Sequence, residues 1–294
     1  ARVFLAHQVN SLSKIYNVYI FTNMKGNANL LDNISDEVKI IDLPIKREIN
    51  LISDLYVLFL LIQLLRKQKF SLVHSANPKA GLLTAIAAWI VRVPNRLHTY
   101  TGQVWAINKG IKRGFLRLLD KLISVLNSQI LVDSQSQKEF LSKEGIFKKE
   151  NALVLGAGSI SGVDLNRFKP SKKIRAEVRK ELNIPSNCVV FLFVGRIKKE
   201  KGVFELAEAF KNISKNNDNA FLIIVGPDEK NFIDDLTKIL DFSVKYARFI
   251  DFTKTPEIYM MASDIFVMPS YREGFGTSVI EAASCGIPSI GSNV

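Results

Sequence analysis

The chain has 294 residues, 47% of them hydrophobic, which is enough for two domains of ordinary size with a sizeable core. Its net charge of +12 suits nucleic acid, an anionic membrane surface or a phosphorylated substrate, and the charge alone does not choose among them. No internal repeats or low-complexity tracts occur, which excludes a repeat architecture. The two cysteines, Cys188 and Cys285, stand far apart within apolar patterns and indicate reduced, buried thiols, consistent with the cytosol.

Two segments bear on secretion and membrane insertion. The first residues read as though the chain begins inside a helix, so no signal peptide is expected. Residues 51–65 form a long apolar run, but the run carries Asp54 and Gln63. It is also shorter than the roughly 20 apolar residues that a membrane span needs. We interpret it as a core helix rather than an interfacial helix.

Strand and helix patterns alternate along the first half of the chain. Short apolar runs predict strands, and longer amphipathic runs predict helices. The predicted strands are residues 17–22, 38–43, 71–75, 96–100 and 129–133. The predicted helices are residues 50–67, 79–91, 109–126 and 134–143. This alternation is typical of a parallel sheet covered by helices on both faces.

Residues 151–170 interrupt the pattern with a glycine-rich stretch and then a basic one, and we place a linker near Pro170. The alternation then restarts. Helices are predicted at residues 174–182 and 200–215, and strands at residues 189–194, 220–225, 248–250, 264–268 and 287–290. We therefore expect an α/β chain of two doubly wound domains, residues 1–170 and 171–294. Ligands bind such sheets at the carboxyl ends of the strands, so two facing domains would form one deep cleft.

The loop and helix at residues 269–286 are central to the functional interpretation. Gly274 and Gly276 let the backbone turn sharply and approach a ligand closely. Thr277 or Ser278 can cap the helix that follows, whose first N–H groups then point at the loop. Such a geometry favours a bound anion such as phosphate.

Two carboxylates, Glu273 and Glu281, flank this turn. Glu273 lies on the loop, where a polar side chain reaches a ligand. Glu281 falls about one turn into a helix of apolar neighbours, and an unpaired buried carboxylate is costly. We therefore expect Glu281 to face a cleft. The alternative is a plain strand, turn and helix with surface glutamates.

A second loop, residues 194–202, follows a predicted strand and opens a helix. Arg196 and Lys201 would stand beside helix N–H groups. Arginine offers a fork of donors for a diphosphate, and lysine offers a mobile point charge. Lys198 and Lys199 are expected to be solvated.

These two loops carry a family resemblance. Glu273 and Glu281 stand within Pro-Ser-x-x-Glu-Gly-Phe-Gly and Glu-Ala-x-x-x-Gly-x-Pro, and Gly-Arg-x4-Lys-Gly surrounds Arg196 and Lys201. Together they resemble the retaining family 4 glycosyltransferases, which have the GT-B fold of two Rossmann-like domains facing across a cleft.

The resemblance implies a role for each residue of the two loops. Arg196 and Lys201 would stabilise the leaving diphosphate, and Glu273 would contact the donor sugar, so these three are the expected catalytic residues. Glu281 would bind the ribose, and neither glutamate is assigned as a nucleophile. The expected donor site comprises Arg196, Lys201, Glu273, Gly274, Phe275, Gly276, Thr277 and Glu281.

Two further segments of the second domain match the family. The nucleobase is expected near residues 249–253, where Asp251 replaces a glycine that the family often has. The turn at residues 225–227 carries Gly226, which we interpret as a position of tight backbone packing.

The resemblance also marks the loop around Gly102 in the first domain. Many relatives have a histidine before this glycine, close to the donor sugar, and here Thr101 takes its place. His98 is interpreted as a hydrogen-bonded core residue. We expect Thr101, Gly102 and Gln103 to bind the acceptor, with the Gln103 amide for hydroxyls and Trp105 as an aromatic face for a sugar ring.

Five cations recur along the predicted helix at residues 109–126, interleaved with large apolar side chains. They are Lys109, Lys112, Arg113, Arg117 and Lys121. A solvated face and a basic amphipathic surface for anionic lipid both fit this pattern. The enzymes that the segment resembles act on lipid-linked sugars, which favours the lipid interpretation.

The resemblance implies a hexosyl- or N-acetylhexosaminyltransferase. It would move a sugar from a nucleotide diphosphate sugar, with UDP favoured, to a polyprenyl-diphosphate-linked or other saccharide acceptor in bacterial surface polysaccharide or glycan synthesis. No cofactor and no metal are expected, since no Asp-x-Asp motif is present. We expect a cytoplasmic protein, peripheral at the inner face of the plasma membrane. Its partners would be the nucleotide sugar, the lipid-linked acceptor and an anionic membrane surface, and not nucleic acid.

Other functions fit the same architecture. They are a sugar-nucleotide epimerase, a phosphorylase, a non-catalytic GT-B protein that binds nucleotide sugar, and a basic protein that binds nucleic acid. Against the family both ends look truncated. A first strand and its glycine loop normally precede the helix that starts near Arg2, and the second domain normally continues beyond Ile290.

Overall fold

The computed structural model describes residues 2–25, 34–46, 49–159, 162–215 and 217–293. The chain divides into two compact units, Ala1–Gly162 and Val163–Val294. The division comes before the expected linker at Pro170 because Val163 and Phe168 already pack in the core of the second unit.

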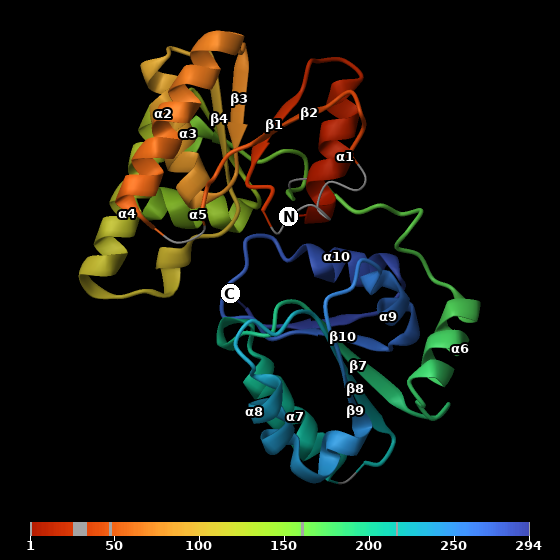
Figure 1. The fold of residues 1–294 in the computed structure, drawn as a ribbon. Helices are drawn as coiled ribbons and strands as arrows, with labels where there is room; N and C mark the ends of the chain where they lie inside the picture. The colour runs from red at the N-terminus through yellow and green to blue at the C-terminus, as the bar shows by residue number, and fades with distance from the viewer. Residues whose placement is uncertain (1, 26–33, 47–48, 160–161, 216, 294) are drawn as a thin grey trace. The chain divides into compact units, whose positions relative to one another are not determined.

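The first unit consists of parallel strands and the helices that connect them (Figure 1). Its strands are β1 (Tyr19–Thr22), β2 (Lys39–Asp42), β3 (Leu72–Ser75), β4 (Asn95–Tyr100), β5 (Gln129–Val132) and β6 (Ala152–Leu153). Its α-helices are α1 (Arg2–Ser13), α2 (Leu51–Gln68), α3 (Pro78–Ile90), α4 (Gly110–Leu126) and α5 (Gln135–Lys143). One sheet has the order β3-β4-β5-β6 and the other pairs β1 with β2, all in parallel. The predicted parallel pairing is confirmed, and β6 is a strand that the sequence did not predict.

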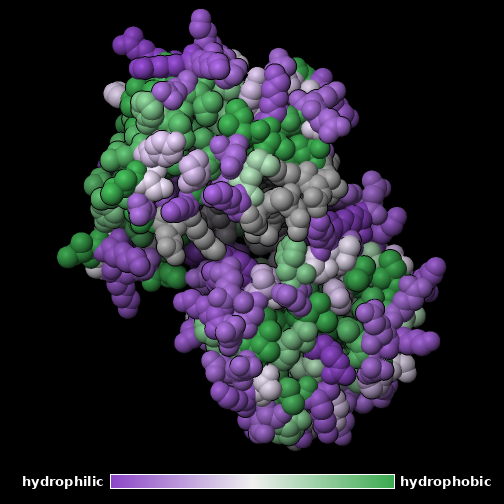
Figure 2. All heavy atoms as spheres, viewed as in Figure 1, coloured by the Kyte–Doolittle hydropathy of each residue, from purple (hydrophilic) through white to green (hydrophobic). Residues whose placement is uncertain are grey.

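Helix α2 is a core helix along one face only. Val57, Leu61 and Leu65 are buried in a cluster shared with α3, whereas Ile52 is 84% exposed and Phe59 is 55% exposed. In Figure 2 hydrophobic side chains gather on the first unit where Figure 1 places α2 and α3. The prediction of a core helix is therefore confirmed for the inner face, while the outer face leaves large apolar side chains exposed. Apolar residues extend around more of α2 than one packed stripe can cover.

The second unit is built on one five-stranded parallel sheet in the order β11-β10-β7-β8-β9. Its strands are β7 (Val189–Val194), β8 (Ala220–Val225), β9 (Ala247–Ile250), β10 (Ile265–Met268) and β11 (Ser289–Gly291). Its α-helices are α6 (Lys172–Glu181), α7 (Val203–Ser214), α8 (Ile233–Leu240), α9 (Pro256–Ala262) and α10 (Thr277–Ser284). The predicted elements are confirmed with ends shifted by a few residues, and α8 and α9 were not predicted.

Strand β8 shows why this unit has three layers. All six of its residues are buried, with Phe221 facing the cluster that contains α6, α9 and α10 and Leu222 facing the cluster that contains α7 and α8. Because helices cover both faces, a continuous apolar run is stable as a strand. Cys188 and Cys285 are free thiols buried in the first of these clusters, as predicted.

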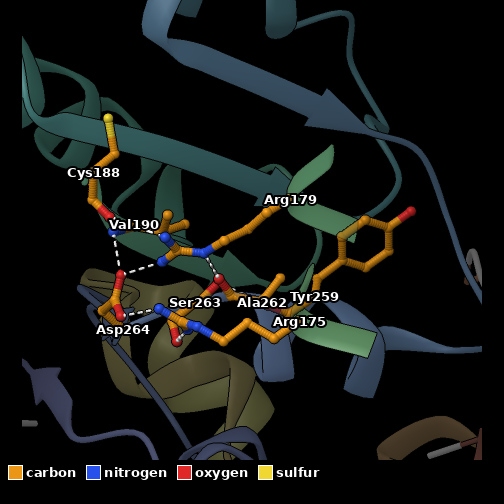
Figure 3. Close-up of polar contacts among 8 residues, drawn as sticks. All are labelled: Arg175, Arg179, Cys188, Val190, Tyr259, Ala262, Ser263 and Asp264. Atoms are coloured by element: carbon orange, nitrogen blue, oxygen red, sulfur yellow. Dashed lines mark hydrogen bonds and ion pairs between the residues drawn. The ribbon is translucent and has the colours of Figure 1, made fainter. Parts of the chain in front are cut away.

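An aspartate at the amino edge of this sheet ties α6 to the strands (Figure 3). Asp264 immediately precedes β10, and its carboxylate accepts hydrogen bonds from Arg175 at 2.6 Å, Arg179 at 2.5 Å and the Val190 N–H at 2.8 Å. Burial would raise the pKa of Asp264, but these donors outweigh burial and hold the pKa below its usual value. We call Arg175, Arg179 and Asp264 the amino-edge cluster.

Candidate active site

The strand order of the second unit creates a switch point between β7 and β10. The chain runs from β7 through β8 to β9, and then returns to the other side of β7 with β10 and β11. The connections after β7 and β10 therefore leave in opposite directions, and doubly wound sheets bind ligands in the crevice that forms there. These connections begin the two loops, residues 195–202 and 269–276, that carry the predicted donor residues.

Lys201 and Glu273 meet across these two loops. Nζ of Lys201 lies 2.5 Å from Oε1 of Glu273, and the same oxygen accepts a hydrogen bond from Oγ of Ser270 at 2.7 Å. Both charged side chains are largely shielded, with exposed fractions of 19% and 21%. The structure thus brings together two of the three predicted catalytic residues. We call Lys201 and Glu273 the carboxyl-edge pair.

Glycines lock the backbones around this pair. A Cβ on Gly202, whose φ is +69°, would lie 2.0 Å from the carbonyl oxygen of Pro269, so only glycine fits. A Cβ on Gly226 would likewise lie 1.9 Å from the carbonyl oxygen of Gly195, which confirms the packing role predicted for Gly226. The close approach fixes the loop after β7 against the loops after β8 and β10.

Arg196 lies in a separate network around Glu229. Nη1 of Arg196 is 3.4 Å from Oε1 of Glu229, and Nζ of Lys198 is 2.5 Å from Oε2 of the same residue. The expectation that Lys198 is solvated is wrong, because Glu229 holds it and its side chain is only 19% exposed. Sequence reasoning missed Glu229, because a glutamate in a polar loop gives no signal until the fold places it beside the loop after β7.

Helix α10 begins at Thr277 with a different cap from the one predicted. The N-cap is Gly276, whose φ is +74°, and no side chain caps the helix. Thr277 and Ser278 already lie within the helix, so the prediction that one of them is the cap is wrong. Since no cap side chain occupies the first N–H groups, the start of α10 is suited to an anion. Phe275, in the loop before it, is half-buried.

Glu281 lies further along α10 and belongs to another electrostatic environment. Burial raises the pKa of the Glu281 carboxyl, Arg167 opposes the shift and Glu257 adds to it. Arg167 also donates a hydrogen bond to Glu257 at 2.7 Å. The predicted poor solvation of Glu281 is confirmed. Sequence reasoning missed Arg167 and Glu257 as its neighbours, because they come from the segment before α6 and from α9.

An open hollow lies beside the carboxyl ends of β8 and β9. It is lined by Asp228, Asn231, Ile233, Asp234, Phe249 and Asp251. Its carboxylates disfavour a phosphate, whereas an aromatic ring with nearby acceptors suits a nucleobase. Residues 249–253 contribute Phe249 and Asp251 to this lining, so the expected place of the base coincides with a hollow, and the assignment stays a prediction.

The predicted acceptor residues follow β4 in the first unit. Thr101 and Gly102 are partly exposed, and Gly102 has a φ of +111°. Gln103 is only 4% exposed, and its side-chain amide hydrogen-bonds that of Gln137 at 2.8 Å. The expected role of Gln103 in binding acceptor hydroxyls is therefore corrected, because its amide is already paired inside the unit.

Trp105 is a core residue and not a face for a sugar ring. Its side chain is 2% exposed, its ring stacks on Phe140 with centroids 5.5 Å apart, and its Nε1 donates to Oδ2 of Asp120 at 2.6 Å. The short 3-10 helix Val104–Ile107, which packs against α4, turns the ring inward. The prediction of an exposed aromatic face is wrong for this reason.

His98 is the hydrogen-bonded core residue that was predicted. It is 2% exposed, and its Nδ1 lies 2.8 Å from Oγ of Ser75. Burial, together with the nearby His74, lowers the pKa of His98 to about 3, so the ring is neutral at physiological pH. A Cβ on Gly81 would lie 2.5 Å from Cε1 of His98, so the glycine makes room for the ring.

Helix α4 presents an exposed apolar stripe. Its residues recur at alternating intervals of four and three, which places them on one helix face. They are Ile111, Phe115, Leu118, Leu122 and Val125, and Ile111 is 93% exposed. In the described part of the chain, no helix combines the length and the hydropathy that a membrane span requires.

Cations flank this stripe, and two of the five pair with Glu144. Arg113 donates to Glu144 at 2.5 Å, and its guanidinium lies 5.7 Å from the centre of the Trp105 ring. Arg117 also lies 3.4 Å from Glu144 and is partly exposed. The cations best placed to meet a partner are the exposed Lys109, Lys112 and Lys121.

Two α/β units of parallel strands, with a basic loop and a glutamate loop at the switch point of the second, are typical of the GT-B class of glycosyltransferases. The family comparison agrees in both halves. Residues 1–132 match the family described as "Glycosyl transferase 4-like", and residues 174–294 match "Glycosyl transferases group 1".

Individual relatives place the chain within that class. It is 35% identical over 254 residues to the capsular polysaccharide biosynthesis glycosyltransferase CapM of Staphylococcus aureus, covering 86% of this chain and 66% of that protein. It is 32% identical over 288 residues to the UDP-Gal:alpha-D-GlcNAc-diphosphoundecaprenol alpha-1,3-galactosyltransferase of Escherichia coli, covering 92% of this chain and 70% of that one. The chain belongs to the family 4 glycosyltransferases, and it spans about two thirds of the length of these relatives.

A solved structure confirms the fold. The crystal structure of Anabaena HepE in complex with UDP and glucose matches with a TM-score of 0.76 at 17% identity, covering 100% of this chain and 77% of that chain. At this identity the match establishes the shared GT-B fold alone.

Proposed function

We propose that the full-length protein is a retaining glycosyltransferase that moves a sugar from a UDP-sugar to a hydroxyl of a polyprenyl-diphosphate-linked saccharide. The bond between the anomeric carbon and the diphosphate breaks, a bond to the acceptor oxygen forms, and UDP leaves with the proton that the acceptor hydroxyl gives up. The observation that carries the proposal is the carboxyl-edge pair, with Lys201 and Glu273 2.5 Å apart at the switch point of the sheet.

Lys201 has the chemistry that the leaving group needs. Negative charge develops on the diphosphate as the glycosidic bond breaks, and a partly buried ammonium stabilises that charge more than it would in water. Further donors would come from the N–H groups at the start of α10 and from Arg196, whose present partner is Glu229 at 3.4 Å. These groups would neutralise the diphosphate without a metal ion.

The two glutamates would hold the sugar and the ribose. A carboxylate accepts hydrogen bonds from hydroxyl groups, and both ends of the donor carry such groups. Glu273 is fixed by Lys201 and Ser270 beside the loop, where a donor sugar would lie. Glu281 would accept from the ribose. The Escherichia coli relative is named for UDP-galactose and a diphosphoundecaprenol acceptor, which supports this choice of donor and acceptor.

A thermal-shift panel of UDP-, GDP- and ADP-sugars on the full-length protein tests the donor. A ligand that binds only the folded state raises the Tm, so a UDP-sugar should raise it most. Transfer to a lipid-linked acceptor should then proceed in the presence of EDTA, and NMR of the product should show a retained anomeric configuration. An epimerised nucleotide sugar, or an inverted product, would contradict the proposal.

We also propose that the enzyme works at the cytoplasmic face of the plasma membrane, held there by α4. The apolar stripe would enter the headgroup region and the flanking cations would meet anionic lipid, at about 1 kcal/mol per cation. The attraction is screened over about a Debye length, so binding should weaken with salt.

Co-sedimentation with vesicles tests this membrane proposal. The full-length protein should sediment with anionic vesicles at low salt and not with neutral ones. Replacing Lys109, Lys112 and Lys121 with Glu should release it, whereas the same change at the exposed Lys169, Lys172 and Lys180 of the second unit should not. Arg113 is left unchanged because it binds Glu144. If both triple variants sediment with anionic vesicles as the wild type does, the cations of α4 are a solvated face.

A further inference from the structure

One oxygen of a buried carboxylate in the first unit has no hydrogen-bond partner among the described residues. Asp133 comes directly after β5, and its side chain is 7% exposed. Its Oδ1 has no hydrogen-bond partner among the residues that the structure describes. Native proteins rarely leave a buried polar atom unpaired, and each such atom needs an explanation. Asp120 is a useful contrast in the same unit, since it is also buried but accepts a hydrogen bond from Trp105 at 2.6 Å.

The place of Asp133 in the sheet points to a ligand. Its N–H donates to the carbonyl of Tyr100 at 3.2 Å, and its own carbonyl accepts from the N–H of Ser159 at 2.7 Å. Asp133 is thereby fixed at the carboxyl edge of the sheet, where α/β proteins bind ligands. Thr101 and Gly102, which the sequence predicts to bind the acceptor, directly follow Tyr100.

The loop beside Asp133, residues 156–159, contains three residues with left-handed backbone conformations. Gly156 and Gly158 have φ values of +54° and +112°, and Ser159, which binds the Asp133 carbonyl, has a φ of +68°. A serine in this conformation is strained, and such strain clusters at sites of ligand binding. A Cβ on Gly156 would meet no atom within 4 Å, so packing does not require this glycine. The loop therefore approaches Asp133 with little side-chain bulk.

We propose that Asp133 binds the acceptor, with its carboxylate accepting a hydrogen bond from a hydroxyl of the acceptor saccharide. This inference rests on the proposed function. A carboxylate would repel the diphosphates of the donor and of the lipid carrier, whereas a neutral sugar offers O–H donors that match an unpaired carboxylate oxygen. Burial raises the pKa of Asp133 to about 6, so the side chain is mostly ionised at neutral pH and is a strong acceptor.

Matched alanine variants of the full-length protein separate this role from a structural one. Asp133→Ala removes a buried carboxylate whose Oδ1 has no hydrogen-bond partner among the described residues, so the Tm should stay the same or rise. The Tm shift with UDP-sugar should also be unchanged, while kcat/KM for the acceptor falls about 10- to 100-fold, as for loss of a charged hydrogen bond. Asp120→Ala leaves the Trp105 N–H unpaired, so it should lower the Tm with no specific effect on acceptor kinetics. Asp133→Asn keeps the side-chain shape, so a fall in kcat/KM in this variant does not come from altered packing.

Acceptor analogues that each lack one hydroxyl identify the contact. The wild type should lose about 10-fold in kcat/KM with the analogue that lacks the bound hydroxyl, and Asp133→Asn should lose little more with that analogue. The substitution Asp133→Asn and the missing hydroxyl each lower kcat/KM. If the combined loss equals the product of the two separate losses for every analogue, Asp133 does not contact a hydroxyl. If Asp133→Ala lowers the Tm as Asp120→Ala does and leaves acceptor kinetics unchanged, the carboxylate is structural. Failure of the wild type to bind any nucleotide sugar would instead refute the proposed function.

Discussion

The second unit uses the same residue types for different purposes at the two edges of one sheet. In the amino-edge cluster, the Asp264 carboxylate accepts from two guanidiniums and a backbone N–H, and its pKa is lowered. At the carboxyl edge, Lys201 and Glu273 neutralise each other, and burial raises the pKa of Glu281. The charges at the amino edge hold the fold together, whereas those at the carboxyl edge are the ones that we propose to meet a ligand. Under the proposed function, the edge of the sheet, and not the residue type, separates structural ion pairs from ligand-binding ones.

Breaking the amino-edge cluster should have the largest effect on stability. Asp264→Ala leaves two guanidiniums and the Val190 N–H without their acceptor, and Arg179 is buried. We expect the free energy of unfolding to fall by about 3 kcal/mol, at the low end for a buried pair because Asp264 is partly solvated. Urea denaturation measures this change. Asp235→Ala, which removes an exposed pair with Lys238, should change stability by less than about 0.5 kcal/mol.

The pH dependence sharpens this contrast. The pKa of Asp264 is lower in the folded protein than in the unfolded chain, so its stabilising effect is present above the ordinary aspartate pKa. The effect is lost as the pH falls through the folded pKa. The stability difference between wild type and Asp264→Asn should therefore shrink in acid and stay constant near neutrality. A difference that instead grows toward acid pH would mean that the two guanidiniums do not stabilise the charged carboxylate.

Breaking the carboxyl-edge pair should affect turnover more than stability. Lys201→Ala would remove the proposed charge-assisted contact to the diphosphate, worth roughly 1.5–3 kcal/mol, so transfer should fall about 10- to 100-fold. Stability should change little, because Glu273 keeps its hydrogen bond from Ser270 and is partly solvated. Lys199→Ala is the control, since Lys199 lies in the same loop and is exposed. Equal transfer rates in the two variants would remove Lys201 from the mechanism.

The sequence predicted the fold well where the pattern is strong. Residues 220–225 are uniformly apolar because both faces of β8 are covered, and the strand was predicted with its observed ends. Helices α8 and α9 were not predicted, because at eight and seven residues they are too short for a clear period. The cap of α10 was misjudged, because a left-handed glycine can end a loop without any capping side chain.

The candidate site was predictable only in part. Lys201 and Glu273 could be found, because each lies in a loop between a strand and a helix with glycines at fixed spacing. Their surroundings could not, because Glu229 and Arg167 come from elements that only the fold places nearby. Trp105 was misjudged because the sequence does not show whether a short 3-10 helix turns a ring outward or inward.

The smallest change in stability is expected from substituting Glu281. This substitution is also the sharpest test of the comparison between the two edges of the sheet. Burial raises its pKa in the folded protein above the unfolded value, so the charged carboxylate lowers stability at neutral pH. As the pH falls through the raised pKa, the folded protein takes up the proton first and gains stability, until the ordinary glutamate pKa is reached. Glu281→Gln should therefore be more stable than the wild type at neutral pH, with the gain disappearing in acid.

Under the proposed function the same substitution should weaken donor binding about 10-fold, because the ribose hydroxyls would lose a charged acceptor. Urea denaturation across pH and the UDP-sugar affinity of Glu281→Gln measure the two effects separately. A variant that gains stability while losing donor affinity behaves opposite to Asp264→Asn, which should lose stability and keep its donor affinity. If Glu281→Gln instead loses stability at neutral pH, the carboxylate is a paired structural group. The contrast between the two edges of the sheet would then not extend to Glu281.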